Sequence, residues 1–234
     1  MIKFFRKIRQ SLLMENKRGI FFVLLIVLSV NHNLRAQDKF KLVEFSSKDG
    51  GKVEAAYFDS GKEKIVIFTH GAIFNKESWY FLAEEFQGLG ISALSIDFRG
   101  YGNSITGNTK KKLFDVLGAI AYAKKQGFNE ICVVGASMGG AAVLSALSYK
   151  QTSVSKVVLL APAGGPPIKS SEIDKFFIVS KEERLYQRVN QIYTESQESK
   201  KIKEYPGNVH AQHMFKTSYT KELRKLIVDF ISAD

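Results

Sequence analysis

The sequence predicts an α/β fold in which a mostly parallel central sheet is covered by helices on both faces. The first observation is that continuous apolar segments, such as Lys64–Thr69 and Glu130–Ala136, alternate with amphipathic segments such as Lys111–Gln126. Strands that are apolar on both sides are typical of parallel sheets buried between helices. The second is size, because 234 residues suffice for one such domain with a sizeable core. No internal repeat or linker divides the chain.

The expected elements begin with two strands of alternating polarity, joined by the tight-turn sequence Lys48–Gly51, which predicts a hairpin. All the strands are expected at 40–45, 53–58, 64–69, 91–97, 130–136, 156–161, 175–180 and 201–205. The helices are expected at 79–89, 111–126, 138–149, 185–194 and 221–231. Only residues 164–175 separate the sixth and seventh strands, which is too short for a helical cap domain.

The basic excess of the chain is concentrated at its N-terminus. The formal net charge is +11, but residues 1–36 contain seven Lys or Arg and one acid, so the remainder carries +5. This balance gives no reason to expect a nucleic-acid partner. The basic cluster at Lys200–Lys203 is expected on a solvated strand edge.

The N-terminal segment has the order of a secretory signal peptide. Lys17 and Arg18 precede an apolar run at 20–30, and Ala36 offers a small residue at a cleavage point before Gln37. We therefore expect residues 1–36 to be a signal peptide, 37–234 the mature domain, and the location periplasmic or secreted. The alternative is a membrane anchor, although the run is about half of the ~20 residues that span a bilayer.

Two details of export remain open at this point. Met14 is an alternative start, because it gives the basic region of a signal peptide a more usual length. The mature chain is expected to have no stable membrane anchor. Its one cysteine, Cys132, lies in a predicted buried strand, cannot form an intramolecular disulfide and is expected to be unreactive.

The strongest motif is Gly135-x-Ser137-x-Gly139, which follows an apolar strand and opens a helix-forming segment. This strand–turn–helix context is that of a nucleophile elbow, in which glycines permit a sharp turn and the serine hydroxyl stands at the strand end. The alternative is a tight turn with a capping serine. Ser137 is our candidate nucleophile.

A serine needs a general base, and three histidines of the mature chain are available. His210 lies in the loop after the last strand, where it can reach Ser137, and is the candidate base. His213 is expected to make local hydrogen bonds or packing contacts, and His70 to hold loop backbone. Two histidines spaced as His210 and His213 are too few ligands to predict a metal site.

The base in turn needs an acid to orient it, and the residues alone do not decide between two adjacent candidates. Glu182 and Glu183 follow the seventh strand, in the chain order serine, acid, histidine. Asp97 also lies at the correct strand end, but we expect it to pair with Arg99 in a turn. Asp115 is expected to cap or pair within its helix.

An oxyanion formed at the serine needs two backbone N–H donors. Met138, the residue after the nucleophile, is the first candidate. The second is expected from the loop after His70 and Gly71, with Ala72 preferred and Ile73 as the alternative.

These motifs together resemble the α/β-hydrolase superfamily. His70–Gly71, Asp97-x-Arg-Gly-x-Gly102, the elbow motif and the C-terminal His210 occur in its order and spacing over about residues 40–234. The chain is most similar to small capless bacterial members. In that comparison Glu183 falls where the family has an aspartate, so the resemblance assigns the acid role to Glu183.

The sequence therefore predicts an exported serine hydrolase of the carboxylesterase type. It is expected to act through an acyl-enzyme on a small or exposed ester, with no cofactor and no metal. A peptidase or amidase with the same triad is the first alternative, because both share this machinery. A catalytically silent binding protein with the same fold is the second. The sequence gives no indication of oligomeric state.

Overall fold

The computed structural model describes residues 39–61 and 63–233. The described residues from Phe40 onward form one compact unit, which holds all the elements that follow. The predicted signal peptide, residues 1–36, lies outside the described residues. Within them, no helix combines the length and apolar character needed to cross a membrane.

One sheet of eight strands forms the centre of the fold, in the order β1-β2-β4-β3-β5-β6-β7-β8. The strands are β1 (Lys41–Ser46), β2 (Lys52–Phe58), β3 (Lys64–Thr69), β4 (Ser92–Ile96), β5 (Glu130–Ala136), β6 (Val154–Leu160), β7 (Asp174–Ser180) and β8 (Lys200–Tyr205). The β1–β2 and β2–β4 pairs are antiparallel, and all other neighbours are parallel. The predicted hairpin and mostly parallel sheet are confirmed.

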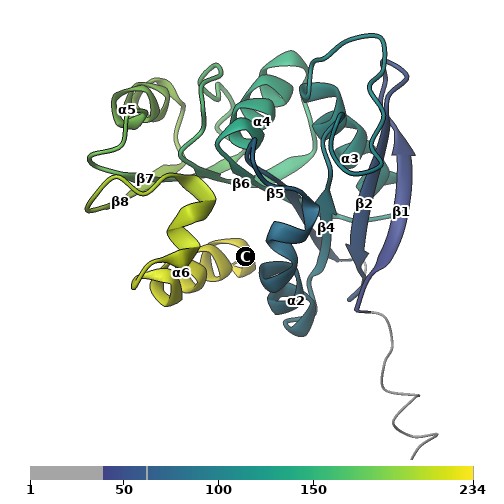
Figure 1. Cartoon of the computed structure of the whole chain (residues 1–234), viewed down its shortest axis with the longest axis horizontal. Helices are drawn as coiled ribbons and strands as arrows, with labels where there is room; N and C mark the ends of the chain where they lie inside the picture. The colour runs from purple at the N-terminus through teal and green to yellow at the C-terminus, as the bar shows by residue number, and fades with distance from the viewer. Residues whose placement is uncertain (1–38, 62, 234) are drawn as a thin grey trace, which may run out of the picture. The chain divides into compact units, whose positions relative to one another are not determined.

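The helices cover both faces of this sheet (Figure 1). On one face lie α3, α4 and α5, and on the other α2 and α6. Their bounds are α2 (Tyr80–Gly88), α3 (Leu113–Lys125), α4 (Met138–Tyr149), α5 (Tyr186–Glu195) and α6 (Thr220–Ser232), with short 3₁₀ helices η1 (Lys76–Trp79) and η2 (Ala211–Lys216). Residues 161–173, between β6 and β7, contain no helix, so no cap domain stands there.

Most predicted elements lie within one or two residues of their expected bounds, and the differences are local. The helix expected at 79–89 is preceded by the 3₁₀ turn η1, whose N-cap Asn75 accepts from the Glu77 N–H. The helix expected from Lys111 begins two residues later, at Leu113. Neither η1 nor η2 was predicted, because each is too short to show a hydrophobic period.

The core fills both sides of the sheet. Strands β3, β5 and β6 are buried along almost their whole length, as their continuous apolar sequences predict. Cys132 lies fully buried in β5, and burial raises the pKa of its thiol to about 12. β8 is an edge strand, which confirms the placement expected for Lys200–Lys203.

This topology decides where a site can form. β3, β4, β5, β6, β7 and β8 run parallel, so their carboxyl ends meet at one edge of the sheet. The chain proceeds from β3 to β4 on one side and from β5 to β8 on the other, so the order reverses at β3. In open α/β sheets, ligands bind outside the carboxyl ends at such a reversal.

Candidate active site

Ser137 stands at the sharp turn between β5 and α4. Its backbone has φ 49° and ψ −112°, a conformation that costs a non-glycine residue of the order of 1–3 kcal/mol. A Cβ on Gly139 would lie 2.3 Å from the Thr69 carbonyl oxygen, and one on Gly135 would lie 3.0 Å from the Gly140 Cα. Both glycines are therefore required by close backbone approach, and the turn is held by the Ser137 N–H, which donates to the Leu160 carbonyl at 2.9 Å.

His210 reaches this serine from the loop after β8. Its Nε2 lies 2.8 Å from the Ser137 Oγ, although 73 residues separate them in the chain. The ring is about one-third exposed, whereas Ser137 is half-buried. The structure thus brings together the serine and the histidine that the sequence singled out.

Glu183 completes a hydrogen-bonded chain. Its Oε2 lies 2.5 Å from the His210 Nδ1, and its side chain is 3% exposed. The Ser180 N–H donates to the other carboxylate oxygen at 3.3 Å. The neighbouring Glu182 is exposed, so Glu183 is the carboxylate beside His210.

The two expected oxyanion donors flank the serine. A Cβ on Gly71 would lie 3.6 Å from the Ser137 Cβ, so the loop after β3 passes beside the nucleophile candidate. The Tyr101 hydroxyl donates to the Ala72 carbonyl at 2.8 Å, which fixes that peptide. Within residues 39–61 and 63–233, neither the Ala72 N–H nor the Met138 N–H donates to a protein acceptor, so both can serve a ligand.

His70 holds loop backbone, as predicted. It is fully buried, its Nδ1 lies 2.8 Å from the Gly71 carbonyl, and its Nε2 accepts from the Phe98 N–H at 3.2 Å. This pattern requires the neutral ring with its proton on Nδ1. Burial lowers the pKa of His70, against the opposing effect of the Asp97 carboxylate. His213 packs against the Phe74 ring, at a centroid distance of 5.2 Å, in agreement with its expected packing role.

The expected pairing of Asp97 with Arg99 is wrong. Asp97 accepts from both the backbone N–H and the Nζ of Lys76, each at 2.7 Å. Lys76 also pairs with Glu54 at 2.8 Å, and this hydrogen bond lowers the pKa of Glu54. Lys76 begins the 3₁₀ turn η1 and reaches Asp97 with both its backbone and its side chain, whereas the Arg99 side chain is engaged by other carboxylates.

Arg99 instead pairs with two other carboxylates. Its guanidinium lies 2.6 Å from Asp49 and 2.7 Å from Asp115, and the Arg99 N–H donates to Asp115 at 3.0 Å. Asp115 therefore pairs outside its own helix, contrary to expectation. The hydrogen bond from Arg99 lowers the pKa of Asp49 strongly.

Sequence reasoning missed Gln212 and Ser180. The Gln212 Oε1 accepts from the Gly71 N–H at 2.6 Å, and its Nε2 donates to the Ser78 hydroxyl at 2.8 Å. The Ser180 hydroxyl donates to the Val209 carbonyl, next to His210, at 2.6 Å. The sequence offered one signal for both, which was their position: Gln212 lies two residues after His210, and Ser180 lies three residues before Glu183.

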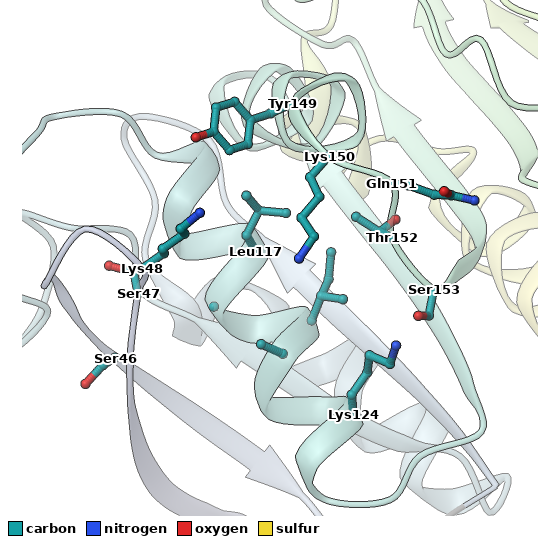
Figure 2. A pocket seen from close by; sticks show the side chains of 13 residues that line it. Ser46, Ser47, Lys48, Leu117, Lys124, Tyr149, Lys150, Gln151, Thr152 and Ser153 are labelled. Atoms are coloured by element: carbon teal, nitrogen blue, oxygen red, sulfur yellow. The ribbon is translucent and has the colours of Figure 1, made fainter.

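Of the hollows on the described surface, two differ in how near they lie to the site formed by Ser137, His210 and Glu183. One, of about 590 Å³, includes Gln212 in its lining and has a wall formed by Phe74, Phe81 and Phe215. The other, of about 440 Å³, lies at the opposite end of α4, between Leu117 and Tyr149 (Figure 2), and is lined by neither Ser137, His210 and Glu183 nor the expected oxyanion donors. In the described part of the chain, no group of three or more His, Cys, Asp or Glu side chains is placed to hold a metal ion.

Known proteins share this architecture. Chains of similar structure include an esterase from Exiguobacterium antarcticum (TM-score 0.67, 13% identity, covering 82% of this chain and 99% of that one). The Pyrococcus furiosus esterase Pf2001 gives a TM-score of 0.68 at 20% identity, with 82% and 91% covered. Est1E from Butyrivibrio proteoclasticus, solved with ferulic acid, gives 0.65 at 17% identity, with 82% and 100% covered. At such identities these likenesses establish the shared α/β-hydrolase fold.

A comparison of sequences identifies the family as well as the fold. The family model described as serine aminopeptidase, S33, matches residues 60–213, a range that contains Ser137, Glu183 and His210. The chain is therefore a hydrolase of the α/β-hydrolase superfamily and a member of the serine aminopeptidase S33 family.

Proposed function

We propose that this protein is an exported serine hydrolase that cleaves carboxylic esters through an acyl-enzyme. The observation that carries the proposal is the hydrogen-bonded chain from Glu183 through His210 to Ser137, with distances of 2.5 and 2.8 Å. A nucleophile within reach of a base, and a base oriented by a third group, is the arrangement that activates serine.

In the acylation step, Ser137 Oγ attacks the ester carbonyl carbon while His210 Nε2 takes its proton. Glu183, which accepts from Nδ1, fixes the tautomer and stabilises the imidazolium that forms. The negative oxygen of the tetrahedral intermediate accepts from the Ala72 and Met138 N–H groups. Removal of one such donor typically costs about 10²–10³ in kcat.

The intermediate then collapses, the bond to the alcohol oxygen breaks, and His210 returns its proton to the leaving alcohol. A water molecule next attacks the acyl-serine with His210 again as the base. Collapse of the second intermediate releases the carboxylic acid and restores Ser137. The whole cycle needs only groups that lie at the strand ends.

A peptidase is the second candidate, because the family description names serine aminopeptidases. The same triad serves both reactions, but an aminopeptidase must also hold a free α-ammonium group, which a carboxylate would bind. The charged side chains that line the hollow around Met138 are Lys110–Lys112, which would repel an ammonium group, and in the hollow beside Gln212 the carboxylate of Glu77 is accompanied by two cations, Lys216 and Arg224. This charge favours ester substrates.

The site has no cap above it, and the hollow beside Gln212 offers an aromatic wall for a small apolar group. We therefore propose small or surface-exposed esters as substrates.

Export is proposed from the sequence alone. The order of basic, apolar and small residues before Gln37 supports signal cleavage near Ala36 and a periplasmic or secreted mature protein.

A fluorophosphonate probe tests the nucleophile, and two substrates separate the candidates. We expect the wild type to be labelled and to hydrolyse p-nitrophenyl acetate faster than alanine p-nitroanilide. Ser137→Ala should lose both labelling and hydrolysis while keeping its thermal unfolding transition. Unimpaired hydrolysis in that variant would refute the serine mechanism, faster anilide cleavage would favour the peptidase, and absence of labelling in the wild type would favour a silent binding protein.

A further inference from the structure

Three consecutive lysines, Lys110–Lys112, stand between the loop after β4 and the start of α3. They line a hollow of about 400 Å³ together with Leu113, the first residue of α3, and the N-terminal part of α4. The lining residues from α4 are Met138, Ala141, Ala142 and Ser145. The hollow therefore begins at the residue that follows Ser137.

Lys112 lies close to the Tyr101 side chain, which contacts the loop of the proposed oxyanion site. Its Nζ lies 5.8 Å from the centroid of the Tyr101 ring, whose hydroxyl holds the Ala72 carbonyl. Its charge is also one of those that lower the pKa of His70, after the larger effect of burial. The Tyr101 contact therefore places this cation beside the loop that carries Ala72, and its electrostatic effect on His70 agrees with that position.

The positive charge of this hollow is not neutralised by the protein. No Asp or Glu lines it, and within residues 39–61 and 63–233 none of the three lysines forms an ion pair. Lys200 and Lys203 on β8 differ, because they pair with Glu198 and Glu222. The N-terminus of α4, at Met138, adds a partial positive charge to the same place.

We propose that Lys110, Lys111 and Lys112 form an anion subsite, so that the preferred ester carries a carboxylate or another anionic group on the part that lies against Met138. The inference rests on the proposed esterase function and names the substrate class of that site. Lysine ammonium groups act as mobile point charges on long stems, so they select for charge rather than for the planar geometry of one anion.

The small side chains of the opposite wall support this assignment. Ala141, Ala142 and Ser145 leave the groove beside α4 open, so a substituent can extend from the scissile bond toward the lysines. An attraction between exposed charges is screened by salt, with a Debye length of about 10 Å at 0.1 M. The selectivity should therefore depend on ionic strength.

Two pairs of esters test the subsite and locate the anion. p-Nitrophenyl acetate is compared with p-nitrophenyl hemisuccinate, which carries the carboxylate in the acyl group. Phenyl acetate is compared with 4-carboxyphenyl acetate, which carries it in the leaving group. For one of the pairs, we expect the wild type to favour the anionic ester about tenfold in kcat/KM at low salt, a preference that shrinks in about 0.5 M salt.

The matched variants remove three charges each. In the triple variant Lys110→Gln, Lys111→Gln, Lys112→Gln, the ratio of anionic to neutral kcat/KM should fall about tenfold. The control triple variant Lys200→Gln, Lys201→Gln, Lys203→Gln removes the same charge from β8 and should keep the wild-type ratio. Equal ratios in the wild type and the first variant would overturn the subsite.

A binding measurement separates this inference from the esterase proposal. Calorimetry with monomethyl succinate on Ser137→Ala, with and without the Lys110–Lys112 changes, reads the subsite without turnover. A Kd about tenfold weaker after the changes supports the subsite even if the wild type hydrolyses no ester. An unchanged Kd together with normal p-nitrophenyl acetate hydrolysis rejects the subsite and leaves the esterase standing.

Discussion

Gln212 accepts a hydrogen bond from the Gly71 N–H at 2.6 Å, across 141 residues of sequence. Gln212 lies two residues beyond His210, and Gly71 lies one residue before Ala72. The loop that delivers the proposed base is therefore tied directly to the loop that delivers a proposed oxyanion donor. Because this hydrogen bond joins the two loops, a displacement of one loop must also displace the other.

Replacement of Gln212 by Met keeps the side-chain volume and removes this tie. We expect kcat on p-nitrophenyl acetate to fall about tenfold with little change in KM, because a displaced Ala72 N–H weakens stabilisation of the transition state alone. Gln191→Ala, at an exposed glutamine of α5, serves as the control. A rise in KM with unchanged kcat would show that Gln212 acts on substrate binding instead.

Glu183→Gln should lower kcat by about 10³–10⁴ with a smaller effect on KM, because an amide cannot stabilise the imidazolium and can favour the wrong tautomer. Glu182→Gln is a matched control one residue away, on an exposed side chain, and should be mild. Steady-state kinetics on p-nitrophenyl acetate decides between them. Near-normal rates in both variants would mean that His210 works without an acid.

The sequence predicted the fold, Ser137 and His210 because their signals are local. Strand periodicity, the glycines around Ser137 and the strand-end position of His210 can all be read within a few residues. The choice of Glu183 over Glu182 needed the family resemblance, since adjacent residues after a strand differ only in the direction that their side chains take.

The errors concerned pairs that are distant in sequence. Asp97 pairs with Lys76, 21 residues away, and Arg99 pairs with Asp49, 50 residues away. No local rule distinguishes these partners from the nearer Asp97–Arg99 pair. The hydrogen bond between Gln212 and Gly71 was missed for the same reason, because it forms only where two loops that are distant in sequence meet.

His70 should make stability fall on the acid side of neutrality. Burial lowers its pKa from 6.5, so the unfolded chain binds a proton below about pH 6.5 that the folded chain does not. The contribution of the neutral His70 ring to the free energy of unfolding is therefore present above that pH. It is lost as the pH falls toward the pKa of His70 in the folded protein. Urea unfolding between about pH 7.5 and 5.0 should show a shallower slope for His70→Asn, and parallel slopes would contradict this assignment.

Short acyl esters should be turned over faster than long ones. Each buried methylene is worth about 0.8 kcal/mol, but residues 161–173 supply no cap against which a long chain could pack. A p-nitrophenyl series from acetate to palmitate, compared by kcat/KM, measures this directly. A steady rise toward palmitate would point to an apolar groove along the surface.

The mature protein should begin at Gln37 or within a few residues of it. The basic, apolar and small residues before that point fit a signal peptide. N-terminal sequencing of protein recovered from its native compartment gives the answer, and Ala36→Arg should impair cleavage. A protein that retains residues 14–36 in the membrane would identify an anchor.

The burial of Cys132 has a practical consequence for spectroscopy. Thiol reagents attack the thiolate, and a pKa of about 12 leaves almost none of it at neutral pH. As Cys132 is the one cysteine of the chain, the native sequence already serves as a background for site-selective labelling. A cysteine introduced at Tyr149, which is 55% exposed, would carry a fluorophore or spin label without removal of the native thiol.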